Sequence, residues 1–274
     1  MKKLLFTCAF IFFLFSCGEG SGTGQQQADL QMERQYCSAE ELAQRKSGCS
    51  ALENFEQWHF QYPSGSEEKG MIDTALTETF KNKYFSLYER PDGKKYMRFS
   101  LDASDKGKST NGSSVRSELR HLNEWTLADK TSLEYTFYLT STDFSTAKFT
   151  VGQFLQHCDT KESPLCRIEV VDGQITAKVI DYEKDGITKA TGKTFSYSLG
   201  SIAQKQEVTI KIAVDTKVMR LYRDGKEYAR HTFDEKVESG YKNYYKAGIY
   251  YQNKDSPKIF SEVFIRDVKV TIEK

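Results

Sequence analysis

The sequence lacks several features that would indicate a function class directly. Its 39 basic and 38 acidic residues leave a formal net charge of +1, so no overall electrostatic field attracts nucleic acid. It has no Cys-x-x-Cys spacing, no nearby paired histidines and no carboxylate cluster at metal-ligand spacing, so neither a metal nor another cofactor is expected. Helical periodicity is almost absent and there is no internal repeat. Any anionic ligand must therefore bind at a local basic patch.

The longest apolar run lies at the N-terminus and indicates export. Lys2 and Lys3 precede a run from Leu4 to Phe15, which is too short for a comfortable membrane span. Leu14 to Cys17 (LFSC) looks like a bacterial lipobox, which implies cleavage before Cys17 and acylation of its thiol. The alternatives are a plain signal peptide with an incidental cysteine, or an N-terminal anchor helix.

Three segments are therefore expected. Residues 1–16 are a lipoprotein signal peptide. Residues 17–50 are the acylated cysteine, a flexible Gly-, Ser- and Gln-rich tether and a short stapled segment with a helix at Ala39 to Gln44. Residues 51–274 are a single catalytic domain. The mature protein is expected to be a monomer, exported and anchored by its lipid to the outer membrane, on the periplasmic side or at the cell surface.

The cysteines agree with export. Of six cysteines, one leaves with the signal peptide and one takes the lipid, which leaves an even number for an oxidising compartment. The simplest of the three possible connectivities is Cys37–Cys49 with Cys158–Cys166. Metal binding by these thiols is the competing interpretation.

From Trp58 onward, short alternating apolar runs follow one another. The turns Arg90 to Gly93 (RPDG) and Arg223 to Lys226 (RDGK) separate some of them. The expected strands are Tyr84–Tyr88, Lys95–Leu101, Leu133–Leu139, Lys148–Phe154, Arg167–Val171, Ile175–Ile180, Val208–Val214, Val218–Tyr222, Tyr228–Phe233, Tyr244–Gln252 and Val263–Ile272. Many short strands with Asp-Gly turns predict an all-β fold, an antiparallel sandwich or jelly roll.

One predicted strand carries an ordered ionic row. In Ser114 to Arg120 (SVRSELR), alternation places Arg116, Glu118 and Arg120 on one face. Two arginines held apart by a carboxylate can fix a guanidinium for bidentate contact with a ligand carboxylate. A solvated charged face of an outer sheet is the alternative.

A second strand places four functional residues on one face. These are Lys246, Gly248, Tyr250 and Gln252. Gly248 would permit close approach of a ligand, and a phenol beside basic side chains can exchange protons. The alternative is a strand with a glycine bulge and an interfacial tyrosine.

A third strand, Val151 to His157, places Gln153, Leu155 and His157 on one face. An amide and an imidazole there could bind a carboxylate and take a proton. A histidine that merely ends a strand beside Cys158 is the alternative.

Together these segments resemble a known family. Arg116 to Arg120 (RSELR) resembles the Arg-(Ser/Thr)-Glu-Leu motif of the alginate lyases of polysaccharide lyase family 7. Tyr244 to Gln252 (YYKAGIYYQ) resembles their Tyr-Phe-Lys-Ala-Gly-x-Tyr-x-Gln motif, in the same order along the chain. The resemblance runs from about Phe55 to the C-terminus. It implies a jelly roll with a concave substrate cleft and β-elimination on a polymer of uronic acids, most often alginate.

The middle motif departs from the family pattern Gln-(Ile/Val)-His. Gln153 takes the Gln place, Leu155 takes the His place, and His157 lies two residues later on the same face. Either a local bulge brings His157 to the cleft, or the enzyme lacks the family's histidine base.

The resemblance implies roles for these residues. Arg116 and Gln153 would neutralise the substrate carboxylate, and Tyr250 would protonate the leaving O4, with His157 or Tyr250 as the base at C5. The expected substrate-binding residues are Arg120, Glu118, Lys246 and Gln252, and the expected partner is an anionic polysaccharide.

Three other functions remain open: a lyase for glucuronan or another polyuronate, a non-catalytic carbohydrate-binding jelly roll, and a hydrolase. The hydrolase would need two facing carboxylates. Glu118 is a poor acid because it stands between arginines.

Overall fold

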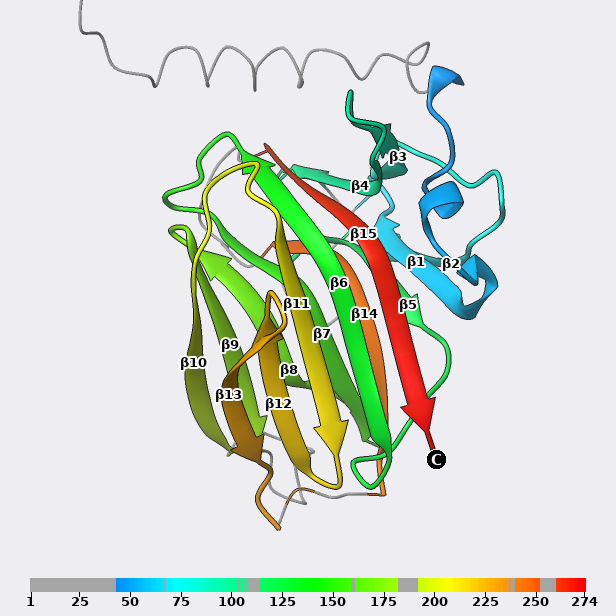
Figure 1. Cartoon of the computed structure of the whole chain (residues 1–274). Coiled ribbons are helices and arrows are strands. Elements are labelled where there is room, and N and C mark those ends of the chain that lie inside the picture. Colours follow the sequence, from blue (N-terminus) through cyan, green and yellow to red (C-terminus); the bar gives the residue numbers. More distant parts are fainter. Residues whose placement is uncertain are drawn as a thin grey trace, which may run out of the picture.

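The structure, a computed structural model, describes residues 43–66, 68–102, 104–105, 107, 114–158, 161–181, 192–235, 237, 240–251 and 260–274. The strands form two antiparallel sheets that lie one behind the other (Figure 1). This arrangement confirms the predicted all-β fold. The predicted signal peptide, Cys17, the tether, Cys37 and Gln252 lie outside the described residues.

One sheet has eight strands in the order β10-β9-β8-β7-β14-β5-β1-β2. Its strands are β1 (Trp58–Pro63), β2 (Met71–Ala75), β5 (Arg116–His121), β7 (Lys148–Cys158), β8 (Lys161–Val171), β9 (Gln174–Asp181), β10 (Lys193–Ser201) and β14 (Lys242–Tyr251). The three strands that carry the sequence motifs, β7, β14 and β5, are neighbours in the middle of this sheet.

The second sheet has seven strands in the order β13-β12-β11-β6-β15-β4-β3. Its strands are β3 (Phe85–Glu89), β4 (Lys95–Asp102), β6 (Lys130–Ser141), β11 (Val208–Asp215), β12 (Val218–Arg223), β13 (Lys226–Thr232) and β15 (Phe260–Glu273). Two short 3-10 helices, η1 (Gly48–Ala51) and η2 (Phe55–Gln57), precede β1. Across the described ranges, no helix has the length and apolar character needed to cross a bilayer.

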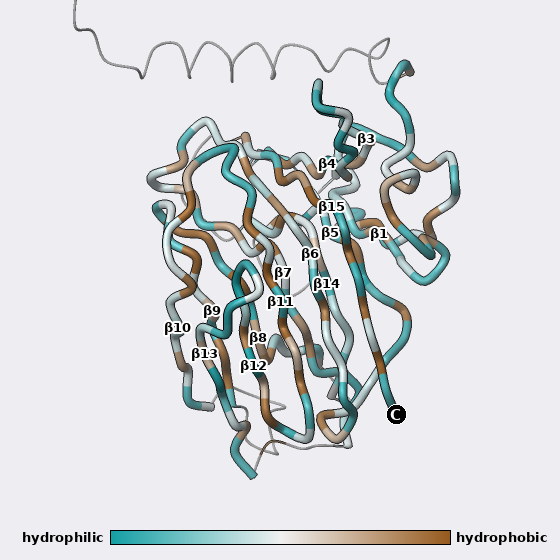
Figure 2. The backbone as a smooth tube through the Cα atoms, viewed as in Figure 1, coloured by the Kyte–Doolittle hydropathy of each residue, from teal (hydrophilic) through white to brown (hydrophobic). Residues whose placement is uncertain are grey.

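The core lies between the sheets because each strand turns alternate side chains inward. In β11, Val208, Ile210, Ile212 and Val214 are buried, and the residues between them are only partly buried. Figure 2 shows the resulting alternation of brown and teal along the strands. Residues on the other face of the eight-stranded sheet are therefore free of core packing and can carry a site.

Three strands were not predicted: β1, which lies between β5 and β2, and β2 and β10, which are the edges of the eight-stranded sheet. An edge strand packs against one neighbour only, so its sequence needs less apolar character. In β10 the apolar or aromatic residues Phe195, Tyr197 and Leu199 alternate with polar residues and glycine. Of the nine positions in this strand, only Leu199 is buried. Of the helix predicted at Ala39 to Gln44, the structure describes only residues 43 and 44, which are helical.

The predicted disulfides are not formed. Cys166 is a free, fully buried thiol. The hairpin register pairs Cys166 with Phe154 but Cys158 with Lys161. Four strand residues therefore separate the two cysteines, roughly 13 Å at the usual rise, whereas a disulfide needs Cα atoms within about 7 Å. The predicted Cys158–Cys166 bond is wrong for this reason. Cys49 is also a free, buried thiol.

Candidate active site

The register of the central strands brings the motif residues onto one patch of the outer face. Lys246 of β14 lies opposite Gln153 on β7 and opposite Arg120 on β5. Two positions further along β14, Gly248 lies opposite Glu118, and Tyr250 lies opposite Arg116. Antiparallel partners share a face of the sheet. The three motifs, far apart in the sequence, therefore form one site.

Glu118 is at the centre of this site and is fully buried. Its Oε1 accepts a hydrogen bond from Gln153 Nε2 at 2.7 Å. Its Oε2 lies 3.5 Å from Arg116 Nη1 and 3.9 Å from Lys246 Nζ. One carboxylate thus holds an amide, a guanidinium and an ammonium, and one positive charge remains in excess. Its role is to position these donors, and its place between cations does not suit it to be an acid.

Lys246 is held from a second side by residues that the motif analysis did not identify. Its Nζ donates to Gln61 Oε1 at 2.6 Å, and Gln61 Nε2 donates to Asp73 Oδ2 at 2.6 Å. The other Asp73 oxygen lies 2.7 Å from His59 Nδ1. These residues belong to β1 and β2. The alternation of His59 and Gln61 was visible in the sequence, but only strand pairing places Asp73 beside them.

The environment of Lys246 changes its protonation. Burial and, to a smaller extent, the charge of Arg116 lower the pKa of Lys246 to about 8, although the charge of Glu118 acts in the opposite direction. The side chain is 1% exposed. Lys246 therefore titrates in the mildly alkaline range, unlike a surface lysine.

Two guanidinium groups cover tyrosine rings in the site. Arg116 lies 4.7 Å from the ring centroid of Tyr250, and Arg120 lies 4.2 Å from that of Tyr244. Tyr250 is half-buried, whereas Tyr244 is fully buried. Burial raises the pKa of Tyr244, and the neighbouring Glu162 raises it as well. Of these two tyrosines, the one that solvent reaches is therefore Tyr250.

The sequence suggested that Gly248 provides space for a ligand, but in the structure this position has another role. A Cβ atom at Gly248 would lie 2.3 Å from the backbone oxygen of Ser117 and 2.7 Å from Cα of Glu118. Its φ is +149°, and the register with β7 shifts between Ala247 and Tyr250. The missing side chain instead allows β5 to approach β14 closely. The glycine-bulge alternative describes this position correctly.

Leu155 and His157 follow Gln153 along β7. Leu155 is 6% exposed and lies opposite Tyr244. His157 is exposed and lies opposite Lys242 of β14 and Glu162 of β8. Within the part of the chain that the structure describes, no group of three or more His, Cys, Asp and Glu side chains could hold a metal ion.

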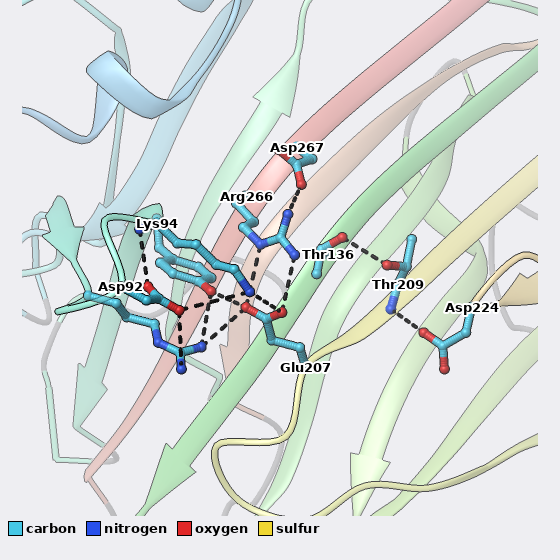
Figure 3. Close-up of polar contacts among 10 residues, drawn as sticks. Asp92, Lys94, Thr136, Glu207, Thr209, Asp224, Arg266 and Asp267 are labelled. Carbon is cyan, nitrogen blue, oxygen red and sulfur yellow. Dashed lines mark hydrogen bonds and ion pairs between the residues drawn. The ribbon is translucent and has the colours of Figure 1, made fainter.

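The outer face of the other sheet has a polar network of a different kind. Glu207 interacts with Arg266 at 3.1 Å, with Arg90 and Lys94 at 3.4 Å, and with the hydroxyl of Tyr96 (Figure 3). Burial alone would raise the pKa of Glu207, but the hydrogen bonds from Arg266 and Tyr96 lower it to about 2. Asp92 and Asp267 pair with Arg90 and Arg266. Acidic and basic groups balance in this network, so it has no surplus charge for an acidic ligand.

Fold and site together define a class of enzyme, a β-sandwich polysaccharide lyase with basic and amide donors beside a phenol. The description of the matching family is "Alginate lyase", and its model matches residues 53–272. The chain belongs to the alginate lyase family. The resemblance read from the two long motifs is confirmed, while the departure at Leu155 stays a prediction. No curated protein sequence matches the chain.

Solved structures share this fold. A variant of the family 7 alginate lyase A1-II′ in complex with product superposes with a TM-score of 0.69 at 20% identity, covering 83% of this chain and 100% of that one. AlyA1 from Zobellia galactanivorans gives a TM-score of 0.62 at 19% identity, covering 83% and 100%. The alginate lyase from a Corynebacterium species gives 0.64 at 14% identity, covering 84% and 99%. The two-sheet sandwich is thus the jelly roll of these lyases.

Proposed function

We propose that the chain cleaves alginate by β-elimination at the outer face of the eight-stranded sheet, and leaves a 4,5-unsaturated sugar at the new end. The observation that carries this proposal is the cluster at Glu118, which holds Arg116, Gln153 and Lys246 beside Tyr250. The similar lyase A1-II′ has been seen in complex with a product, GGG, and with a substrate, GGMG.

The first chemical task is to stabilise the charge that builds on the substrate carboxylate when C5 loses its proton. Arg116 pairs with Glu118 through Nη1 while its side chain stays 12% exposed, so the outer part of the guanidinium can donate to a ligand oxygen. Gln153 uses one amide hydrogen on Glu118 and retains a second. Donors that are already oriented stabilise such an anion without reorganisation.

The second and third tasks are to remove the C5 proton and to protonate the leaving O4. We assign the acid to Tyr250, because its phenol lies beside the Arg116 guanidinium and is reached by solvent. In mannuronate and glucuronate, H5 and O4 lie on the same side of the ring, so one phenol can take the first proton and return it to O4. In guluronate they lie on opposite sides, and a separate base is needed.

The residue at position 155 then determines which uronate the enzyme is expected to prefer. An isobutyl side chain at the position of the family histidine cannot take a proton, and His157 lies further along β7, in the row of Lys242. We therefore propose that Tyr250 performs both proton transfers and that the enzyme prefers mannuronate-rich alginate. Glucuronan is the second substrate to consider, because it has the same syn arrangement.

A substrate panel tests this proposal. Wild-type enzyme, Tyr250→Phe and His157→Ala are given pure poly-mannuronate, poly-guluronate and glucuronan, and the ultraviolet absorbance of the C4=C5 product is followed. Wild type and His157→Ala should cleave poly-mannuronate at similar rates, while Tyr250→Phe loses about 10³-fold or more in kcat. Efficient cleavage of poly-guluronate by His157→Ala would refute the single-phenol mechanism.

We also propose that the protein is an exported monomer anchored by lipid at Cys17. The support is the sequence LFSC that ends at Cys17, after a short apolar run with two preceding lysines. Labelling with a radioactive fatty acid should mark the wild type but not Cys17→Ser, and detergent phase partition should move the variant to the aqueous phase. Equal labelling of both would refute the anchor.

A further inference from the structure

A row of polar side chains continues from the active site across β8 and β9. The pairing registers place one residue from each successive strand at the same level of the eight-stranded sheet. From β5 to β10 these residues are Arg120, Lys246, Gln153, Arg167, Lys178 and Ser196. Neighbouring strands lie about 4.8 Å apart, which is close to the length of one sugar residue in an extended uronate chain.

Arg167 is held by a neighbouring carboxylate through Nε, and its two Nη groups remain available to a ligand. Its flanking residues Cys166 and Ile168 are fully buried in the core, so Arg167 projects from the outer face. Its Nε donates to Glu169 Oε1 at 3.0 Å, and Glu169 is 1% exposed. Within the described ranges, its two Nη groups make no hydrogen bond, and its side chain is 24% exposed. Such a guanidinium matches a carboxylate in two-point contact.

The charge around Arg167 is positive. Glu169 is shared between Arg167 and Lys148, whose Nζ lies 3.4 Å from Oε2. Lys178, on the next strand, bonds to the hydroxyl of Ser196 at 2.8 Å and so keeps its full charge. Three basic groups therefore face one carboxylate, a surplus of two positive charges.

The other flank of the site is different. There β1 and β2 present His59, Gln61 and Asp73, which are bonded to one another and to Lys246. Asp73 would repel a polyanion. The outer face is thus asymmetric, and an acidic chain lying across the strands is attracted on the β8–β9 side.

We propose that Arg167 and Lys178 form carboxylate subsites for further uronate residues of the polymer, on the β8–β9 side of the catalytic strands. Glu169 is the positioning residue that holds Arg167. This inference rests on the proposed lyase function and extends it. It predicts that the enzyme acts better on long uronate chains than on the shortest cleavable oligomer.

Steady-state kinetics test the subsites. Arg167→Gln, Lys178→Gln and the double variant are compared with wild type on poly-mannuronate and on the shortest mannuronate oligomer that wild type cleaves. The double variant should lose about tenfold in kcat/KM on the polymer, mainly through KM, because two charge-assisted contacts are lost. On the short oligomer it should stay within about twofold of wild type. Lys211→Gln, on the opposite sheet, is the matched control and should change neither value.

Further readouts separate this inference from the lyase function. Arg167→Lys keeps the charge but loses the fork, so its KM should lie between wild type and Arg167→Gln. Calorimetric titration with poly-mannuronate needs no turnover, and the double variant should bind it more weakly even if wild type released no unsaturated product. Failure of the lyase function would show as wild-type protein without product. Unchanged affinity for the polymer, or equal losses on polymer and short oligomer, would overturn the subsites.

Discussion

At the centre of the site, a single buried carboxylate orients three hydrogen-bond donors. The sequence motifs predicted only that donors of this kind lie on one face of a strand. Glu118 accepts from Gln153 and pairs with Arg116, and it lies within 3.9 Å of Lys246 Nζ. Burial of such charges costs more than their mutual attraction returns unless the hydrogen bonds are complete. The cluster is therefore better explained by ligand binding than by stability. It keeps Arg116 and Gln153 oriented before substrate arrives.

Lys246 makes the site sensitive to pH. Burial lowers its pKa to about 8, so its charge is lost as pH rises through that value. Because uronate carboxylates stay ionised in this range, KM for the polymer should rise above pH 8 while kcat changes less. KM measured from pH 6 to 10 tests this prediction. Lys246→Arg is the control, since a guanidinium stays charged and should flatten the profile.

The same shift affects stability in a defined direction. The folded-state pKa of Lys246 lies below the ordinary lysine value, so the charged form is disfavoured in the native state. This cost is fully present below pH 8 and is relieved as pH rises toward the ordinary value of about 10.4. For the binding prediction above, a wild-type KM for the polymer that does not change with pH would contradict the role of the Lys246 charge in substrate binding.

At the scale of the strands, alternation revealed most elements, including the edge strands β3 and β13 of the seven-stranded sheet. Strands with neighbours on both sides, such as β6 and β11, have strong alternation and were predicted. The edge strands β2 and β10 of the eight-stranded sheet were not, because an edge strand tolerates polar residues. The internal strand β1 was not predicted either. The close approach of β5 to β14 also depends on a pairing that no single strand encodes, and Gly248 makes it possible.

Gly248→Ala should separate these two strands. The new Cβ meets backbone atoms of Ser117 and Glu118, which cannot move like the end of a side chain. The variant should lose about 2–4 kcal/mol of unfolding free energy, together with most of its kcat/KM. Gly93→Ala is the matched control. It has a positive φ of +80° but open space around it, and it should cost only about 1 kcal/mol and leave activity intact. Equal effects of the two changes would contradict the steric explanation.

At the scale of the whole molecule, the two sheets meet along one edge through a buried histidine. His231 of β13 lies 2.8 Å from Asp181 of β9 through Nε2, and its Nδ1 lies 2.9 Å from the hydroxyl of Tyr197 on β10. The imidazole also packs against Phe233 and Phe195. With no disulfide formed at Cys49 or Cys166, contacts of this kind and the core hold the described sheets together.

His231→Ala should therefore lower the unfolding free energy by about 1–2 kcal/mol, since it leaves two partly buried polar groups without their partner. Urea denaturation followed by circular dichroism measures this loss. His59→Ala provides the comparison: the His59 pair with Asp73 is exposed, so its loss should cost less than about 1 kcal/mol. A His231 variant as stable as wild type would show that this contact does not hold the edge.

The sequence by itself determined the two-sheet fold class and the three strands of the site, because strand alternation and two long motifs are local properties of the chain. It also predicted that Arg116, Gln153 and Tyr250 share one site, and the strands that carry them are neighbours. Only the tertiary structure decided that Gly248 serves strand packing and that Cys158 and Cys166 lie too far apart to bond. The network from Lys246 through Gln61 to Asp73 was likewise invisible, as was the row that reaches Arg167 and Lys178. Such features depend on the order and register of the strands. These are determined by contacts between residues that are far apart in the sequence.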